Sequence, residues 1–399
     1  MKDKQVAKLI AQEKSRQNKV TNLIPSDNHS SEDVFEALGS CFSNKYSEGY
    51  PGKRYYGGQE FTDKLEILCQ ERALKAFKLS PSKWHVNVQL LSGSPANLAA
   101  YMALQSHKVK SKKQKADFKI MGMTLKSGGH LTHGHNVSAT GIFYKQIPYE
   151  VDPKTEKLNY ENLKKIAKQE RPDVIVAGFT AYPRKIDFKK FREIADSCGA
   201  YLMVDMSHIS GLIAGGEHPS PFPYADIVTT TTHKTLRGPR GAMIFARKDK
   251  RELDKFVDKA VFPGLQGGPH MNKIAATAVT LGEVMKPSFK KYAKQVVKNT
   301  KVLADELRKK GWRIVSGGTD NHLLLVDVWM NGEGLSGKDA EKKLEKAGII
   351  VNKNTIPGDK RSPFNPSGIR LGAAEVTTRG MKEKDMKKIA ERIDRSLRN

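Results

Sequence analysis

The chain has 399 residues, and its 69 lysine and arginine residues exceed its 43 aspartate and glutamate residues, which gives a formal net charge of +26. A chain of this length can bury more than one hydrophobic core, so we expect two or three structural units. The sequence holds no apolar run of about 18 residues and begins with the polar stretch 1–5, which argues against a membrane-spanning helix and against export.

In chain order we expect an N-terminal helical arm over residues 1–20, a large domain over residues 21–282 and a small domain over residues 283–399. Apolar strands alternate with amphipathic helices in the large domain, which predicts an α/β fold with a mostly parallel sheet flanked by helices. Strands are expected at 119–123, 173–179, 200–205, 225–228 and 242–246, and an N-capped helix at 187–199 completes a β-α-β unit. A long lysine-rich helix after 282, strands at 321–328 and 348–351, and helices at 338–347 and from about 382 predict a smaller α+β domain.

The first chemical motif is Ser92-Gly93-Ser94, directly before the expected helix 96–103. Serine hydroxyls and free backbone N–H groups at a helix N-terminus form an anion site, so the motif fits a phosphate cradle. The same residues are also ordinary helix caps.

A histidine group follows, with His130, His133 and His135 inside six residues. Zinc is the alternative to consider, but this spacing does not place the three rings on one helix face, and no cysteine or carboxylate lies nearby in the sequence. The surrounding glycines indicate a loop. We therefore expect no metal site.

A strand then ends in Asp205, with His208 three positions later. The carboxyl end of a strand in an open α/β sheet is where ligands bind. A carboxylate there would keep a pyridinium nitrogen protonated, as pyridoxal phosphate requires. The alternatives are an N-cap for Asp205 and a packed loop position for His208.

Lys234 comes after four threonines and before a Gly-Pro-Arg-Gly turn. A lysine at a strand end in a covered loop has a lowered pKa and becomes the nucleophile of a Schiff base. Most lysines are surface residues, and that remains the alternative for Lys234 taken alone. Together, Lys234 and Asp205 supply the amine and the anion that pyridoxal phosphate needs.

The chain resembles the serine hydroxymethyltransferases, pyridoxal-phosphate enzymes of fold type I, over essentially its whole length. The resemblance is carried by residues 44–58, 128–134, 227–241, 262–269, 351–357 and 367–370. It implies catalytic roles for Lys234 as the aldimine lysine, Asp205 as the pyridinium partner, His208 beside the ring hydroxyl, His130 stacked on the ring, and Glu48 and Tyr56 as an acid-base pair from a neighbouring subunit.

The same resemblance implies the binding residues. Those for the cofactor are Ser92, Gly93, Ser94, Thr180, Thr231 and His233, with Tyr46 and Gly268 reaching the phosphate from the neighbouring subunit. Those for substrates are Ser26, Arg370, Leu125, Gly129, Leu131 and Asn354, of which Arg370 grips the amino-acid carboxylate and the last four hold folate.

The implied reaction moves the hydroxymethyl group of serine to tetrahydrofolate and yields glycine and 5,10-methylenetetrahydrofolate. A folate-independent pyridoxal-phosphate aldolase for threonine-like amino acids and a cofactor-holding scaffold for polyanions are the alternatives. The shared site implies a homodimer or homotetramer.

Three cysteines, Cys41, Cys69 and Cys198, follow no disulfide or zinc pattern, which is typical of a cytoplasmic protein. A lysine cluster would attract polyanions, although no nucleic-acid-binding motif accompanies it; the cluster is Lys108, Lys110, Lys112, Lys113 and Lys115.

Overall fold

The structure is a computed structural model that describes residues 1–112 and 117–398. Lys113 and Lys115 of the lysine cluster lie outside the described residues. Among the helices of the described part, none is both long enough and apolar enough to span a bilayer.

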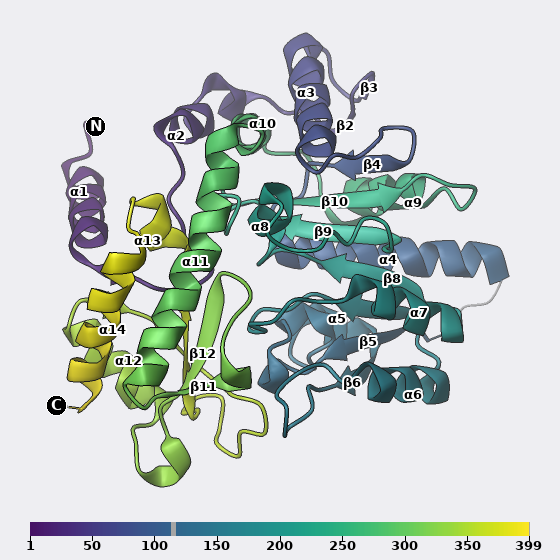
Figure 1. Ribbon diagram of the computed structural model, residues 1–399. Coiled ribbons are helices and arrows are strands. Elements are labelled where there is room, and N and C mark those ends of the chain that lie inside the picture. Colours follow the sequence, from purple (N-terminus) through teal and green to yellow (C-terminus); the bar gives the residue numbers. More distant parts are fainter. Residues whose placement is uncertain (113–116, 399) are drawn as a thin grey trace.

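A seven-stranded sheet forms the centre of the large domain (Figure 1). Its order is β4 (Trp84–Asn87), β10 (Ala242–Arg247), β9 (Ile227–Thr231), β8 (Tyr201–Asp205), β7 (Val174–Ala177), β5 (Lys119–Met123) and β6 (Lys145–Tyr149). All neighbours run parallel except β10, which is antiparallel to both β9 and β4. The mostly parallel α/β sheet expected from the sequence is confirmed.

Helices cover both faces of this sheet, and successive strand residues alternate between the two resulting cores. In β7, Val174 and Val176 join the core beneath α4 (Gly93–Lys112) and α9 (Leu253–Lys259). Ile175 and Ala177 join the core on the other face. That second core includes residues of α3 (Glu60–Ala76), α6 (Tyr160–Glu170), α7 (Phe188–Cys198) and α10 (Met271–Val284). The sheet is therefore buried on both faces, and polar functional side chains can lie only where its strands end, at the amino edge or the carboxyl edge of the sheet.

The expected β-α-β unit is confirmed as β7, α7 and β8. Asp187 caps α7 by accepting from the backbone N of Lys190, and Gly199 ends the helix with a φ of 71°. The strand expected at 173–179 is shorter, because the chain turns at Gly178, where φ is 107° and a Cβ would lie 1.9 Å from the carbonyl oxygen of Asp205. This turn carries Thr180 to the carboxyl edge of the sheet.

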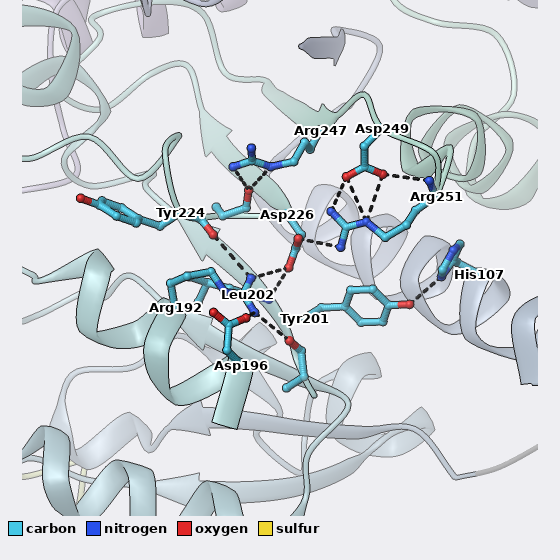
Figure 2. Close-up of polar contacts among 12 residues, drawn as sticks. His107, Arg192, Asp196, Tyr201, Leu202, Tyr224, Asp226, Arg247, Asp249 and Arg251 are labelled. Carbon is cyan, nitrogen blue, oxygen red and sulfur yellow. Dashed lines mark hydrogen bonds and ion pairs between the residues drawn. The ribbon is translucent and has the colours of Figure 1, made fainter. Parts of the chain in front are cut away.

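The strand expected at 225–228 also shifts, to begin at Ile227. Asp226 bonds through its side chain at the amino edge of the sheet, as Figure 2 shows. Its carboxylate binds Arg192 at 2.9 Å, Arg251 at 2.8 Å and the backbone N of Leu202 at 2.8 Å. Asp226 thereby ties β8, α7 and the segment after β10 together.

A second, antiparallel sheet belongs to the C-terminal part, in the order β11 (Arg313–Ile314), β12 (Leu323–Asp327), β15 (Gly368–Gly372) and β14 (Asn352–Asn354). It shares its own core with α11 (Pro287–Lys309), α12 (Gly337–Lys346) and α14 (Glu383–Arg398). The strand expected at 348–351 is β13 (Ile349–Ile350), which pairs with β1 (Thr21–Asn22) instead of joining this sheet. The separate sheet and core support the proposed division near residue 282.

Helix α1 (Lys4–Lys19) contributes no buried residue within this chain. Its apolar side chains Val6, Leu9 and Ile10 are 43%, 64% and 52% exposed. The last turn of the helix and the residue after it are fixed to the body by Arg379, which donates to the backbone carbonyls of Asn18 and Val20. The helix thus projects as an arm whose three apolar side chains are only partly covered by the described residues.

Candidate active site

The carboxyl ends of the parallel strands open into a cavity of about 330 Å³. Strand β8 ends there with Asp205, β9 ends with Thr231, and β15 of the second sheet adds Arg370. This edge of an open sheet is where ligands are expected. Of the residues predicted for the site, the cavity is lined by Ser26, Ser92, Gly93, Ser94, His130, Thr180, Asp205, His208, Thr231, His233, Lys234 and Arg370.

Lys234 lies in the tight loop between β9 and β10. Its carbonyl accepts hydrogen bonds from Asn28 Nδ2 at 2.9 Å and from the backbone N of Arg237 at 3.0 Å, which hold the loop closed. Burial lowers the pKa of the Lys234 amine to about 8, while the Asp205 carboxylate opposes this shift and Arg370 adds to it. A partly buried amine in a cavity that loses its proton this readily can act as a nucleophile, which fits the predicted role better than that of a solvated surface lysine.

Asp205 is the last residue of β8 and is buried at the cavity. Oδ2 accepts from Asn97 Nδ2 at 2.8 Å and from His133 Nε2 at 3.2 Å, and Oδ1 accepts from the backbone N of Ser207 at 3.0 Å. Burial alone would raise the pKa of this carboxyl, but the hydrogen bonds and the imidazoles, His133 foremost, lower it overall. Asp205 is therefore a buried anion, and it does not cap α8 (Ser210–Gly215), whose N-cap position is Ile209.

The N-terminus of α4 opens into the cavity through Ser92, Gly93 and Ser94. A Cβ on Gly93 would lie 2.8 Å from Thr231 Cγ2, so the helix can approach β9 this closely only with glycine at this position. The helix has 20 residues, and its first turn presents backbone N–H groups without helical partners. Serine hydroxyls and N–H groups at such a helix end suit a phosphate.

Two buried polar atoms of cavity-lining residues, Thr231 Oγ1 and His233 Nδ1, have no hydrogen-bond partner within the chain. Buried polar atoms are almost always paired, so these two indicate where a ligand completes the structure. The cavity combines the amine of Lys234, the anion of Asp205 and the anion-binding end of α4. These groups fit the aldehyde, the ring nitrogen and the phosphate of pyridoxal phosphate.

Arg370 is buried in the middle of β15. Its Nε donates to Asn352 Oδ1 at 3.0 Å and its Nη1 donates to the carbonyl of Thr180 at 2.7 Å. Burial lowers the pKa of Arg370 to about 10, which leaves the guanidinium charged at neutral pH. With two of its nitrogens fixed by the protein, the guanidinium presents its remaining donors in a defined direction, as carboxylate binding requires.

Three histidines of the cavity, His130, His208 and His233, are neutral near pH 7. Burial, with a smaller effect of His133, lowers the pKa of His130 to about 4. Burial, with a smaller effect of Lys234, lowers the pKa of His233 to about 3. Burial likewise holds the pKa of His208 well below its usual value. Within residues 1–112 and 117–398, no group of three metal-ligating side chains is placed to hold an ion. His133 bonds Asp205 instead.

The predicted acid-base pair lies elsewhere in this chain. Tyr56 Oη donates to Glu48 Oε2 at 3.2 Å, and Tyr46 Oη donates to Glu48 Oε1 at 3.4 Å. A Cβ on Gly268 would lie 3.2 Å from the Tyr46 ring, so Gly268 belongs to the same group. None of these four residues lines the cavity, and both tyrosines are about half exposed or more, Tyr46 at 59% and Tyr56 at 49%. We call Tyr46, Glu48, Tyr56 and Gly268 the outer group.

The residues predicted to hold folate lie beside the cavity rather than in its lining. Leu125 is in a turn at 125–127, Leu131 begins the next turn, and Gly129 lies between them. Asn354 ends β14, and the adjacent Thr355 donates to the carbonyl of Lys126 at 3.2 Å. Two segments more than 200 residues apart thereby meet, with Leu131 42% exposed.

Sequence reasoning missed two residues that support the site, Asn97 in the cavity lining and Lys273 behind it. Asn97 bonds Asp205 and also accepts from Thr229 Oγ1 at 2.7 Å. Lys273 is 5% exposed and donates from Nζ to the carbonyls of Val88 and Leu90, at 2.8 and 2.9 Å, in the segment that leads to the α4 cradle. The periodicity of α10 puts Lys273 among buried positions, which is the signal that would have singled it out.

Comparison with known proteins agrees with this geometry. The family model described as serine hydroxymethyltransferase matches residues 1–393. A protein of Schizosaccharomyces pombe named "Probable serine hydroxymethyltransferase, cytosolic" is 50% identical over 99% of this chain and 85% of its own length. A Saccharomyces cerevisiae protein named "Serine hydroxymethyltransferase, cytosolic" is also 50% identical, over the same shares of the two chains.

Proposed function

Because this chain belongs to the serine hydroxymethyltransferase family, we propose that its cavity binds pyridoxal phosphate and carries out the reaction of that family. The enzyme transfers the hydroxymethyl group of L-serine to tetrahydrofolate and yields glycine and 5,10-methylenetetrahydrofolate. One observation carries the proposal: a partly buried lysine with a lowered pKa shares a cavity with a buried, ionised aspartate.

When bound, pyridoxal phosphate supplies an electron-withdrawing ring that takes up the electron pair released as the bond to the hydroxymethyl group breaks. Lys234 provides the amine that attaches the cofactor, and Asp205 keeps a proton on the ring nitrogen. Ser92, Ser94 and Thr231 bind the phosphate at the N-terminus of α4. Their positions are set by the sheet and by α4, so the cofactor site is pre-formed.

Arg370 binds and orients the carboxylate of the amino acid. Its anchoring to Thr180 and Asn352 joins the small-domain sheet to the segment after β7, so the carboxylate is held by a rigid wall. His130, neutral because of its burial, stacks on the ring without adding charge. Leu125, Gly129, Leu131 and Asn354 hold the folate at the rim.

Glu48 moves the proton at the hydroxymethyl oxygen or at the folate nitrogen, and Tyr56 positions it. Since the outer group does not line the cavity of its own chain, we propose that it completes the cavity of a second copy. The protein is then a homodimer, or a homotetramer built from such dimers. The exposed apolar residues of the α1 arm support this arrangement, because a second copy would cover them.

Both yeast relatives are named cytosolic, and we place this chain in the same compartment. The folate-independent aldolase and the polyanion scaffold are not favoured by these relationships. Purified protein with serine is expected to release glycine only when tetrahydrofolate is added. Release that is equally fast without tetrahydrofolate would establish the aldolase instead.

The cofactor site is tested by borohydride trapping. Protein saturated with pyridoxal phosphate, reduced and digested, is expected to carry the label on Lys234. Lys273 is the matched control, because burial lowers the pKa of its amine to about 8 as well, but it does not line the cavity. The Lys273→Met variant should keep the label and Lys234→Ala should lose it. Label that persists in Lys234→Ala would refute the assignment.

Subunit mixing tests the shared site. The Lys234→Ala and Glu48→Gln proteins are each expected to be nearly inactive. After dissociation and reassociation, half of the dimers are hybrids with one intact cavity, so activity should return to roughly a quarter of wild type. Mixing Lys234→Ala with Asp205→Asn should restore nothing, since both residues serve the cavity of their own chain. A failure of the first mixture would show that Glu48 acts within its own subunit.

A further inference from the structure

His322 is a buried histidine that no sequence pattern singled out, and it reaches the active-site histidine His208. Its Nε2 lies 3.2 Å from His208 Nδ1, and the two ring centroids are 5.4 Å apart with an interplanar angle of 30°. His322 is 0% exposed and His208 is 5% exposed. The contact joins the two sheets, because His208 follows β8 and His322 immediately precedes β12.

The backbone around His322 is fixed from both sides. Its carbonyl accepts from the backbone N of Ala373 at 3.1 Å. The preceding residue, Asn321, donates from its amide to the carbonyl of Tyr182 at 2.9 Å, and its own oxygen accepts from the N of Leu323 at 3.0 Å. The backbone that carries His322 is therefore held in place by contacts that do not involve His208.

Neither ring carries a proton on both nitrogens near pH 7. Burial lowers the pKa of His322 to about 3, and the positive charges of Arg370 and Lys234 lower it further, as does His218. The same burial and charges, with His130, hold the pKa of His208 well below its usual value. In a contact between two neutral imidazoles, one nitrogen donates and the other accepts.

The other ring nitrogen of His322, Nδ1, indicates which of the two histidines donates the hydrogen bond. His322 Nδ1 is buried and has no hydrogen-bond partner. If His208 donated to His322 Nε2, His322 Nδ1 would carry the hydrogen and become a buried N–H group without an acceptor, which is rare in folded proteins. If His322 Nε2 donates, Nδ1 is only an unused acceptor. The second arrangement is favoured.

We propose that His322 is a positioning residue that donates from Nε2 to His208 Nδ1 and so fixes His208 in the tautomer with its hydrogen on Nε2. His208 lines the cavity, and with Nδ1 engaged, Nε2 is the nitrogen left for a bound group. His208 is then a fixed donor toward an anionic oxygen. The inference rests on the proposed function only in taking that oxygen to be the one on the cofactor ring.

The tautomer is measured first without cofactor, by two-bond ¹H–¹⁵N correlation of histidine-labelled protein, with His208 assigned by its absence in His208→Gln. The expected spectrum shows His208 protonated on Nε2. Protonation on Nδ1, or on both nitrogens, at pH 7 would overturn the proposal. Since this experiment needs no pyridoxal phosphate, its failure is distinct from a failure of the borohydride trapping on Lys234.

Variants at His322 supply the second test. His322→Leu removes the donor, so His208 should exchange between tautomers, and the visible band of bound pyridoxal phosphate should titrate about one pH unit higher because its ring oxygen loses a donor. His322→Gln, whose amide replaces the Nε2 donor, should restore both readouts. An unchanged His208 in His322→Leu, or no rescue by glutamine, would contradict the proposal.

The matched control is His218→Leu. His218 is a buried histidine near His322 that lies outside the cavity lining and bonds through Nδ1 with the carbonyl of Pro219. Its loss removes a ring of the same size without touching the donor to His208. The tautomer and the titration of the bound cofactor should stay as in wild type. An equal shift in His218→Leu would show that packing, not the hydrogen bond, is responsible.

Discussion

The two edges of the large sheet each bury an aspartate, and the two aspartates are used differently. At the amino edge, both carboxylate oxygens of Asp226 are bound by arginines and by a backbone N–H, and Arg251 is held in turn by Asp249 (Figure 2). At the carboxyl edge, Asp205 accepts from Asn97, His133 and a backbone N–H, has no arginine partner, and lies in a cavity with Lys234. The charge of Asp226 therefore stabilises the fold, whereas the charge of Asp205 is available to a ligand in the cavity.

Buried polar atoms without partners lie near both carboxylates: Arg192 Nε beside Asp226, and two others at the cavity, where a ligand can complete them. Thr231 Oγ1 and His233 Nδ1 are buried at the carboxyl edge without partners, although a buried unpaired polar atom is unfavourable. Such a cost is typical of functional sites, where the ligand supplies the missing bond. The comparison leads to predictions that separate loss of activity from loss of stability.

The largest expected effect is that of Asp205→Asn. The variant removes the anion at the ring nitrogen, and kcat should fall by about a thousandfold, as for other losses of a preorganised charge in an active site. The free energy of unfolding should fall by only about 1 kcal/mol, because the amide nitrogen cannot accept the bonds of one carboxylate oxygen but the variant also removes the desolvation cost of a buried charge. Steady-state kinetics with serine and tetrahydrofolate, combined with thermal unfolding, measures both. Normal kcat in this variant would remove Asp205 from the mechanism.

Asp226→Asn should lower the stability of the protein and leave kcat unchanged. The variant takes one carboxylate from both Arg192 and Arg251, which keep Asp196 and Asp249 as their other partners, and we expect a loss of about 2 kcal/mol in the free energy of unfolding. The folded fraction should retain the wild-type kcat, because Asp226 lies at the opposite edge of the sheet. Denaturant unfolding and activity per folded molecule test this. A large loss of kcat in folded protein would contradict a purely structural role for Asp226.

The pH dependence of cofactor capture gives a smaller effect. The pKa of Lys234 is lowered to about 8, so its neutral, reactive form gains population as pH rises through 8 and is nearly complete above it. The rate at which cofactor-free protein captures pyridoxal phosphate should therefore rise about tenfold from pH 7 to pH 9 and then level off. Stopped-flow absorbance measures this rate. A rise that continues about tenfold per pH unit up to about pH 10 would indicate an ordinary exposed lysine.

The smallest effect is expected at Lys273. Lys273→Met replaces the ammonium that holds the carbonyls of Val88 and Leu90, so the segment before Ser92 loosens and the affinity for pyridoxal phosphate should fall about fivefold. Stability should change little, because the variant also removes a buried charge. Equilibrium titration with the cofactor measures the affinity. Unchanged affinity would mean that the remaining contacts suffice to hold the cradle.

Sequence alone predicted the parallel sheet, the β-α-β unit and the cavity residues Lys234 and Asp205, because each depends on local patterns of apolar, capping and glycine residues. It missed Asn97 and His322, which meet their partners only after the sheets assemble, across 108 and 114 positions of the sequence. Lys273 was hidden among 69 cationic residues, since composition does not distinguish a buried lysine from an exposed one. The predicted roles of the outer group came from family resemblance and remain predictions.

One side chain links the phosphate-binding segment before α4 with the outer group. Gln89, three positions before Ser92, donates from Nε2 to Glu66 Oε1 and to the backbone carbonyl of Gly49, which lies beside the outer group. The backbone carbonyl of Gln89 accepts a hydrogen bond from Gln266 Nε2. If the outer group serves a neighbouring subunit, damage at Gln89 impairs the centre of its own chain and that of its neighbour together. Such an allele would fail to complement any other defective allele, and in a heterozygote it would act dominantly.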